Sequence, residues 1–172
     1  MQSETYSVLD CIKYDDMETD HLSIYNFSNT ANLLYSTEWA LGGNSLKWDY
    51  DNTGTTTTKY WGWQFLENPS STAYDISALK GKTVKLEMDI HSEVDFSTSS
   101  NAGFYIRVYY KDSSHTSWTA LTNSNLIYSN VTHYQDSFEV QNDCTGIWVR
   151  INANGNCPSG VMYTDNWKIY PI

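Results

Sequence analysis

The chain has 172 residues, a length that suits a single domain with a sizeable hydrophobic core. Its formal net charge of −10 repels phosphate backbones, so we expect no nucleic-acid partner, and no stretch is apolar enough for membrane insertion. Charged residues make up 17% of the chain and aromatic residues 15%, a balance that favours pleated, half-buried strands.

Short segments with strand character follow one another along the chain, and turn signals separate them. The segment 84–90 shows the clearest alternation of apolar and polar side chains, and it follows the turn Lys80-Gly81-Lys82. No segment carries a convincing helical stripe. In chain order, the predicted strands are 45–50, 60–66, 84–90, 104–110, 126–128, 137–140, 147–152 and 165–170.

Eight strands after an N-terminal segment match the strand count of a jelly roll, an all-β, two-sheet antiparallel β-sandwich. In that topology the first, eighth, third and sixth strands form one sheet, and the second, seventh, fourth and fifth form the other. The sequence shows neither an internal repeat nor a linker. We therefore expect one jelly-roll domain over residues 15–172, with residues 1–14 as an N-terminal arm or the end of a preceding segment.

Alternation along these strands separates the side chains of the core from those of the outer faces. A slip of one residue would exchange the two sets, so the assignment depends on the phase of the pleat. The apolar alternates predicted to fill the space between the sheets are Trp61, Trp63, Phe65, Leu86, Met88, Phe104, Ile106, Val108, Val149, Ile151, Trp167 and Ile169.

The outer face of the sheet formed by 60–66, 104–110 and 147–152 carries aromatic rings and arginines, where solvent-facing strands ordinarily carry Thr, Lys and Ser. Aromatic rings offer apolar surface to the C–H side of a sugar, while Arg and Gln donate hydrogen bonds to its hydroxyls. An exposed aromatic patch marks a contact surface. We name this set the aromatic–arginine face and predict that it binds a glycan or polysaccharide: Tyr60, Gln64, Tyr105, Arg107, Tyr109, Trp148 and Arg150.

The residues of the aromatic–arginine face are also consistent with two roles that involve no sugar. In the first, the rings are buried against another protein or by self-association of the chain. In the second, they are covered locally by the chain's own loops or by residues 1–30.

Three short segments resemble the jelly-roll carbohydrate-binding modules, which have a galactose-binding-like β-sandwich. These modules often read G-x-S-L, then L-x-G-K-x-Y-x-L, then a closing strand with D-D/N before a hydrophobic residue. The matching segments are Gly43-Asn44-Ser45-Leu46, Leu79 to Leu86 and Tyr163 to Ile169, and Val84 departs from the family's usual Tyr. The resemblance covers about residues 15–172. It implies a non-catalytic, glycan-binding role on the concave sheet or at the loop tips, and the concave sheet corresponds to the aromatic–arginine face.

The resemblance also implies a structural calcium ion where the N-terminal segment meets the last strand. The matching positions are Asp165 and an N-terminal acid, for which the candidates are Asp15, Asp16 and Glu18. Calcium takes six to eight oxygen ligands, so carboxylates from distant segments suit it.

Similar domains occur in phage tail, baseplate and capsid decoration proteins, which gives an alternative function: a virion structural protein that contacts other virion proteins and adheres to host glycans. Residues 1–5 lack the features of a signal peptide. The strand between Cys144 and Cys157 holds these thiols roughly 25 Å apart, so we predict that all three cysteines are free, which favours a reducing compartment. We expect the protein on a virion or an extracellular surface.

Catalytic interpretations find little support in the sequence. Glu87 and Asp89 share a face and resemble a glycosidase pair, but they lie on the sheet opposite the aromatic–arginine face. The four histidines are scattered and form no zinc motif, and no nucleophile or phosphate-binding motif is present. We therefore predict a protein that is not an enzyme.

Overall fold

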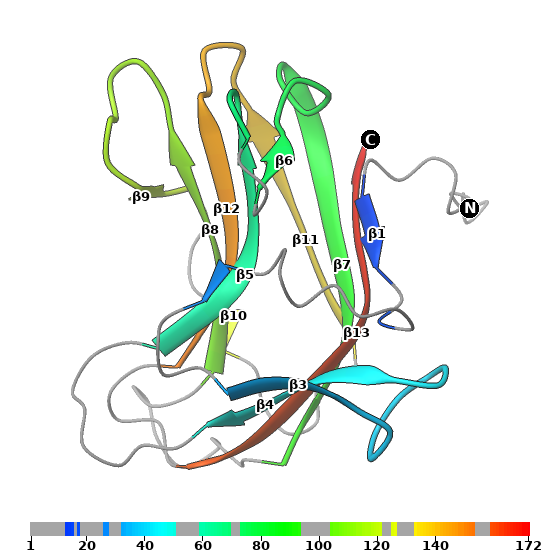
Figure 1. Cartoon of the computed structure of the whole chain (residues 1–172). Coiled ribbons are helices and arrows are strands. Elements are labelled where there is room, and N and C mark those ends of the chain that lie inside the picture. The colour runs from blue at the N-terminus through cyan, green and yellow to red at the C-terminus, as the bar shows by residue number, and fades with distance from the viewer. Residues whose placement is uncertain are drawn as a thin grey trace.

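The structure is a computed structural model, and it describes residues 13–15, 17, 26–27, 32–50, 59–69, 73–93, 104–121, 125–126, 133–153 and 159–172. These residues form two sheets that lie face to face as a β-sandwich (Figure 1). The described residues contain no helix, and so none long and apolar enough to cross a membrane. The all-β sandwich that the sequence predicts is confirmed.

The first sheet is built around the C-terminal strand. Its central strand β13 (Gly160–Pro171) lies between two strands that alternate cleanly in the sequence. In spatial order the sheet runs β11 (His133–Val140), β7 (Lys82–Ser92), β13, β4 (Ser45–Tyr50) and β3 (Asn32–Ser36), with β1 (Lys13–Asp15) also paired to β13. The order β11-β7-β13-β4 is the predicted arrangement of the sixth, third, eighth and first strands.

The second sheet carries the aromatic–arginine face. In spatial order it runs β10 (Asn125–Leu126), β8 (Phe104–Lys111), β12 (Gly146–Ala153), β5 (Lys59–Leu66) and β2 (Asn26–Phe27). The short strand β6 (Tyr74–Asp75) pairs with β5 in parallel, and β9 (Thr119–Ala120) pairs with β8. Figure 1 shows β8, β12 and β5 side by side in this layer. The pairing predicted for the second, seventh, fourth and fifth strands is confirmed.

All of the residues predicted to fill the core are buried, at 0% or 1% exposure. Indole rings dominate the interior, where Trp167 of β13 packs between Trp61 and Trp63 of β5 with centroid distances of 5.1 and 4.7 Å. The sheets therefore meet through large rings that remove much apolar area from water. Met17 is buried in the same core although it belongs to no strand, and nothing in the alternation pattern indicates it.

A bulge in β13 fixes a loop to the first sheet. The pairing of β13 with β7 shifts register between Asp165 and Lys168, and Asn166 adopts the left-handed conformation with φ of 51° that asparagine tolerates better than most residues. Asp165 Oδ1 accepts the Asn166 backbone N–H at 2.7 Å, and its Oδ2 accepts the Leu41 backbone N–H at 2.9 Å. The buried carboxylate thus links the loop before β4 to the last strand.

Strand β1 crosses the predicted boundary between arm and domain. Lys13 and Tyr14 pair with Ile169 and Lys168 of β13, and Asp15 pairs with Trp167. Two residues of the predicted arm therefore add to the first sheet, while residues 1–12 lie outside the described residues.

Candidate functional site

The aromatic–arginine face is organised in three rows that cross β8, β12 and β5. One row joins Tyr109, Trp148 and Gln64, the next joins Arg107, Arg150 and Gly62, and the third joins Tyr105, Asn152 and Tyr60. All seven predicted residues lie in these rows. Their neighbours along the strands, which include Ile106, Val149 and Ile151, are fully buried between the sheets, so the pleat has the predicted phase.

Arg150 is the centre of the face because aromatic rings surround its guanidinium group. The guanidinium carbon lies 3.6 Å from the ring centroid of Tyr60, 4.5 Å from that of Trp148 and 4.8 Å from that of Tyr109. Cation–π attraction stabilises such contacts, more strongly when the cation is shielded from water. Burial lowers the pKa of Arg150, and the charge of Arg107 lowers it further, while the hydroxyls of nearby tyrosines oppose the change.

Arg107 makes looser contacts with the rings of its own strand. Its guanidinium carbon lies 5.5 Å from the ring centroid of Tyr105 and 5.8 Å from that of Tyr109. The side chains of Tyr105, Arg107 and Tyr109 are half-buried, as are those of Tyr60 and Gln64. These five side chains are accessible in part, as a contact surface requires.

Trp148 projects away from the core as predicted, but only 6% of it is exposed, so it is not the open ring that the sequence suggests. Its indole meets Tyr60 edge to face at 5.1 Å and Trp118 at 5.3 Å. Trp118 lies outside any strand, just before β9, and Lys111 stands over its ring at 4.6 Å. Local covering is thus the correct interpretation for Trp148, because a loop tryptophan packs onto it.

Two residues of the rows were not predicted. Asn152 is fully buried and its Nδ2 donates to the backbone oxygens of Arg150 at 3.3 Å and Tyr105 at 3.4 Å, while its Oδ1 has no partner within the described part of the chain. Gly62 opposes Arg150, and a Cβ built there would lie 1.9 Å from the Val149 carbonyl oxygen. Continuing the alternation from Trp148 and Arg150 indicates Asn152, whereas the need for glycine follows only from the close backbone approach.

The predicted calcium ligands are only partly described. Asp165 is buried, and both of its carboxylate oxygens accept backbone N–H groups; the backbone of Asp15 pairs with β13, while Asp16 and Glu18 lie outside the described residues. No group of three or more His, Cys, Asp or Glu side chains that could hold a metal occurs in the described part of the chain. The described side chains supply one carboxylate at the predicted site, whereas calcium takes six to eight oxygen ligands. Calcium binding therefore stays a prediction from the resemblance.

The two carboxylates that resemble a glycosidase pair have other partners. Asp89 accepts from Asn166 Nδ2 at 3.1 Å and pairs with His133 Nδ1 at 2.8 Å, whereas Glu87 forms an ion pair with Lys85. Although burial raises the pKa of Glu87, hydrogen bonds from Lys85 and Tyr170 lower it more, so the carboxyl group is held in its charged form. A glycosidase acid needs a raised pKa, and Glu87 has the opposite shift.

A second cluster of rings lies on the outer face of the first sheet. The rings of Trp39, His91 and Tyr163 contact one another, with centroid distances of 5.5 Å from His91 to Trp39, 5.8 Å from His91 to Tyr163 and 6.2 Å from Trp39 to Tyr163. The Tyr163 hydroxyl donates to Glu38 at 2.7 Å, and Lys47 forms an ion pair with the same carboxylate. This cluster joins the loop after β3 to β13, and its charged groups are paired with one another.

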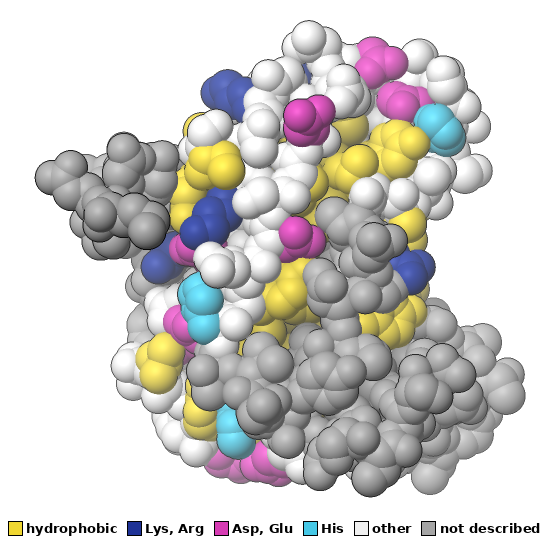
Figure 2. Space-filling view, turned by 180° about the vertical axis from the view of Figure 1, so that it is seen from behind, with side chains coloured by type: hydrophobic (Ala, Val, Ile, Leu, Met, Phe, Trp, Pro, Cys, Tyr) yellow, Lys and Arg dark blue, Asp and Glu magenta, His cyan; other side chains and the backbone are white. Residues whose placement is uncertain are grey.

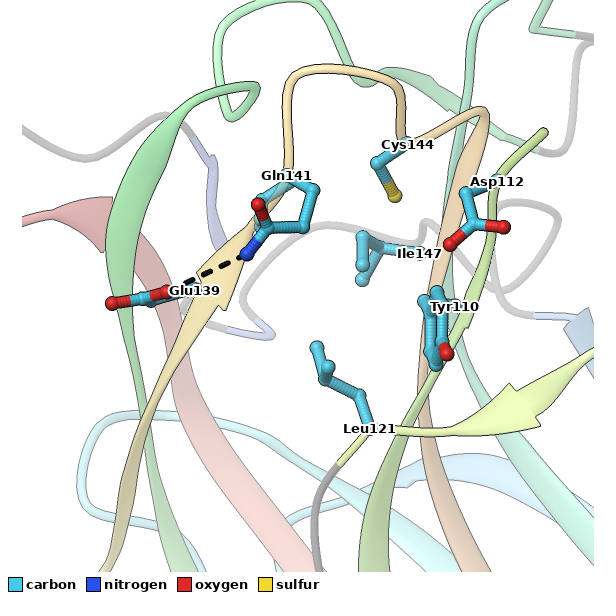
Figure 3. Close-up of a pocket in the computed structure, with 8 residues that line it drawn as sticks. Tyr110, Asp112, Leu121, Glu139, Gln141, Cys144 and Ile147 are labelled. Carbon is cyan, nitrogen blue, oxygen red and sulfur yellow. Dashed lines mark hydrogen bonds between the residues drawn. The ribbon is translucent and has the colours of Figure 1, made fainter. Parts of the chain in front are cut away.

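A cavity of about 150 Å³ opens between the edges of the two sheets (Figure 3). Glu139 and Gln141 of the β11 edge stand on one side, Tyr110 and Asp112 on the other, and the Cys144 side chain points in from the turn above. Seen from behind, hydrophobic side chains reach the surface along the middle of the molecule (Figure 2). Cys144 is a buried free thiol, and burial raises its pKa, which disfavours the reactive thiolate.

Comparison with known proteins identifies the fold. No family model matches the sequence, and no curated protein matches it. Solved structures do match: a xylan-binding domain of carbohydrate-binding module family 22 has a TM-score of 0.62 and 18% identity, covering 96% of this chain and 97% of that one. A family 28 carbohydrate-binding module specific for non-crystalline cellulose has a TM-score of 0.55 and 13% identity, covering 98% and 97%.

A tailspike protein of bacteriophage CBA120 also matches, with a TM-score of 0.54 and 8% identity, over 86% of this chain and 19% of that one. The identities to all three structures are low, so the likeness establishes the fold. The chain has the jelly-roll β-sandwich fold of carbohydrate-binding modules, and the resemblance seen in the sequence is confirmed at that level.

Proposed function

We propose that the protein is a non-catalytic carbohydrate-binding module and that the aromatic–arginine face holds the glycan. The observation that carries this proposal is the set of three rows across β8, β12 and β5, which places four aromatic rings and two guanidinium groups on one outer sheet face. The residues of this face carry the proposal, since the fold alone hosts many functions.

The chemistry of the face suits a sugar chain. The half-buried rings of Tyr60, Tyr105 and Tyr109 offer apolar surface to the C–H faces of pyranose rings, and Gln64 and the guanidinium groups offer hydrogen bonds to hydroxyls. Xylan and non-crystalline cellulose are the ligands named for two structures with this fold, so β-linked plant polysaccharides are the first ligands to test. Each stacked ring contributes on the order of 1 kcal/mol, and together with the hydrogen bonds of the face we expect weak, micromolar to millimolar affinity.

A glycan array followed by isothermal titration calorimetry tests the proposal. Tyr105→Ala removes a partly accessible ring from the face, and Trp148→Ala removes the ring that supports Tyr60 and Arg150. Trp39→Ala is the matched control, because this half-buried ring lies outside the aromatic–arginine face, against His91 and Tyr163 of the first sheet. Binding that the first two variants weaken and the control leaves unchanged supports the proposal. Failure to bind any glycan, or equal binding by all variants, rejects it.

A second candidate function is a virion component that adheres to glycans on a host surface. The tailspike protein of bacteriophage CBA120, which contains a domain of the same fold, favours it. This function uses the same face for sugar and adds contacts with other virion proteins or with a second copy. Light scattering distinguishes the two, since a chain that stays monomeric at high concentration speaks against assembly through self-association.

A further inference from the structure

The chain contains two arginines, and the second sheet places them directly opposite each other: Arg150 of β12 pairs with Arg107 of β8. Like charges at directly opposed positions destabilise a strand pair. In a chain with a net charge of −10, the two guanidinium groups nevertheless share one row of one face. This pairing of like charges lowers stability, and it lies in the candidate binding site. Its benefit is therefore expected in the binding of the ligand.

The side chain of Arg150 lacks an anionic partner in the described part of the chain. Burial acts most strongly on its charge, followed by Tyr109, Tyr60, Tyr105 and Arg107, and no ion pair joins Arg150 to a carboxylate of the described residues. Its buried Nε has no hydrogen-bond partner in the part of the chain that the structure describes. A guanidinium carries five donors and no acceptor, and buried cations ordinarily pair with an anion. The rings that surround Arg150 attract the cation but carry no negative charge to pair with it.

We infer that the glycan bound by the aromatic–arginine face carries a carboxylate, as a uronic acid does, and that this carboxylate lies between Arg107 and Arg150. The inference rests on the proposed function and adds the chemical class of the ligand. The planar guanidinium fork matches a carboxylate through two parallel hydrogen bonds, and charge-assisted bonds are about twice as strong as neutral ones. Tyr60, Tyr105 and Tyr109 then stack on the neighbouring sugars of the chain.

The net charge of the protein limits how many carboxylates the glycan carries. A surface with a net charge of −10 repels a dense polyanion over a distance of about 10 Å at 0.1 M salt. A single carboxylate between Arg107 and Arg150 is in contact with both cations, where short-range attraction is stronger than the screened repulsion. We therefore expect a sparsely substituted acidic glycan, such as glucuronoxylan, to bind better than polygalacturonate.

The experiment compares glucuronoxylan with its carboxyl-reduced form, in which each uronic acid has become a neutral sugar. Binding is also measured for unsubstituted xylan, polygalacturonate, alginate and a sulfated polysaccharide. The wild-type protein is expected to bind the acidic form at least about tenfold more tightly than the reduced form, which is the size of effect that a hydrogen-bonded charge gives. Raising the salt concentration is expected to shrink this difference.

Arg107 is the residue to change, because its nearest ring centroid is 5.5 Å away, whereas Arg150 is packed against Tyr60 at 3.6 Å. Arg107→Gln is expected to remove the preference for the acidic form, and Arg107→Lys, which keeps the charge but not the fork, to retain part of it. Lys82→Gln, an exposed change on β7 of the other sheet, is the charge-matched control and leaves the preference intact. Thermal unfolding checks that each variant is folded.

The outcomes separate the two proposals. Equal binding of the acidic and carboxyl-reduced forms, or a preference that survives Arg107→Gln, overturns the carboxylate inference and leaves glycan binding standing. Binding of the sulfated polysaccharide alone overturns the assignment of a carboxylate. Binding of no polysaccharide overturns the proposed function, and the inference with it.

Discussion

Tyr60 supports Arg150 more closely than any other ring does, with the guanidinium carbon 3.6 Å from the ring centroid. The two side chains come from neighbouring strands, β5 and β12, and Tyr60 also meets Trp148 edge to face. The orientation of the guanidinium on the face therefore depends on an aromatic ring at position 60.

Replacing Tyr60 with leucine tests this dependence. The change keeps an apolar side chain but removes the π-system, so a cation–π contact of about 1–2 kcal/mol is lost and glycan affinity is expected to fall roughly tenfold. Tyr60→Phe retains the ring and is expected to bind within a few-fold of the wild type. Isothermal titration calorimetry on both variants measures the difference. Equal losses in the two would show that the hydroxyl, not the ring, matters.

Gly62 is expected to tolerate no larger residue. In Gly62→Ala the new Cβ would meet the carbonyl oxygen of Val149, a backbone atom that cannot rotate away, so β5 and β12 must move apart. We expect a loss of at least about 2 kcal/mol in the free energy of unfolding. Gly146→Ala is the control, since its Cβ would meet only the ends of the Trp118 and Leu66 side chains, at 3.0 and 3.1 Å. Urea unfolding of both variants gives the comparison, and an unchanged Gly62→Ala would refute the close approach.

Stability in acid is expected to depend on Glu38. Hydrogen bonds from Lys47 and then Tyr163 lower the pKa of its carboxyl group below the usual 4.5. The unfolded chain therefore takes up the proton first as the pH falls, so the stabilisation is present above about pH 4.5 and is lost as the pH falls through the lower pKa of the folded state. In Glu38→Gln the difference in unfolding free energy from the wild type should be largest near neutral pH and shrink in acid. Denaturant unfolding over a pH series measures it. In Lys47→Met the difference in unfolding free energy from the wild type should also shrink in acid. A difference that stays constant with pH would contradict the role of Glu38.

Cys144 is expected to be inert in the folded protein. It is 2% exposed, and burial raises the pKa of its thiol, so little thiolate forms at neutral pH. Treatment with iodoacetamide followed by peptide mass spectrometry should find Cys144 unmodified in the native protein and fully modified after denaturation. Rapid modification without denaturant would mean that the turn between β11 and β12 opens readily.

Alternation of buried and outward side chains predicted the fold because it extends over six residues or more in the long strands. In β7, for example, Leu86 and Met88 face the core, and Lys85 and Glu87 face outward. Strands of two or three residues, such as β1, β6 and β9, show no period, and so they were not predicted. The start of β13 was also missed, since Gly160 to Thr164 precede the bulge that changes the phase.

The sequence predicted which side of the sheet the seven side chains occupy, but not how they are arranged there. Pleat phase places Tyr105, Arg107 and Tyr109 on one face from the sequence of β8 alone. That Arg107 lies opposite Arg150 depends on the register between strands, which alternation leaves open. The burial of Trp148 depends on Trp118, a residue whose loop has no strand pattern and whose position only the three-dimensional structure gives.

The position of β13 has a consequence for how the protein assembles. This strand bonds to β1, β4 and β7, all of which precede it in the sequence. During synthesis these strands emerge before β13 does, and the hydrogen-bonding edges that pair with it stay open until it has been made. Folding of the first sheet is therefore a late event, and a chain that stops before residue 160 lacks the strand around which that sheet closes.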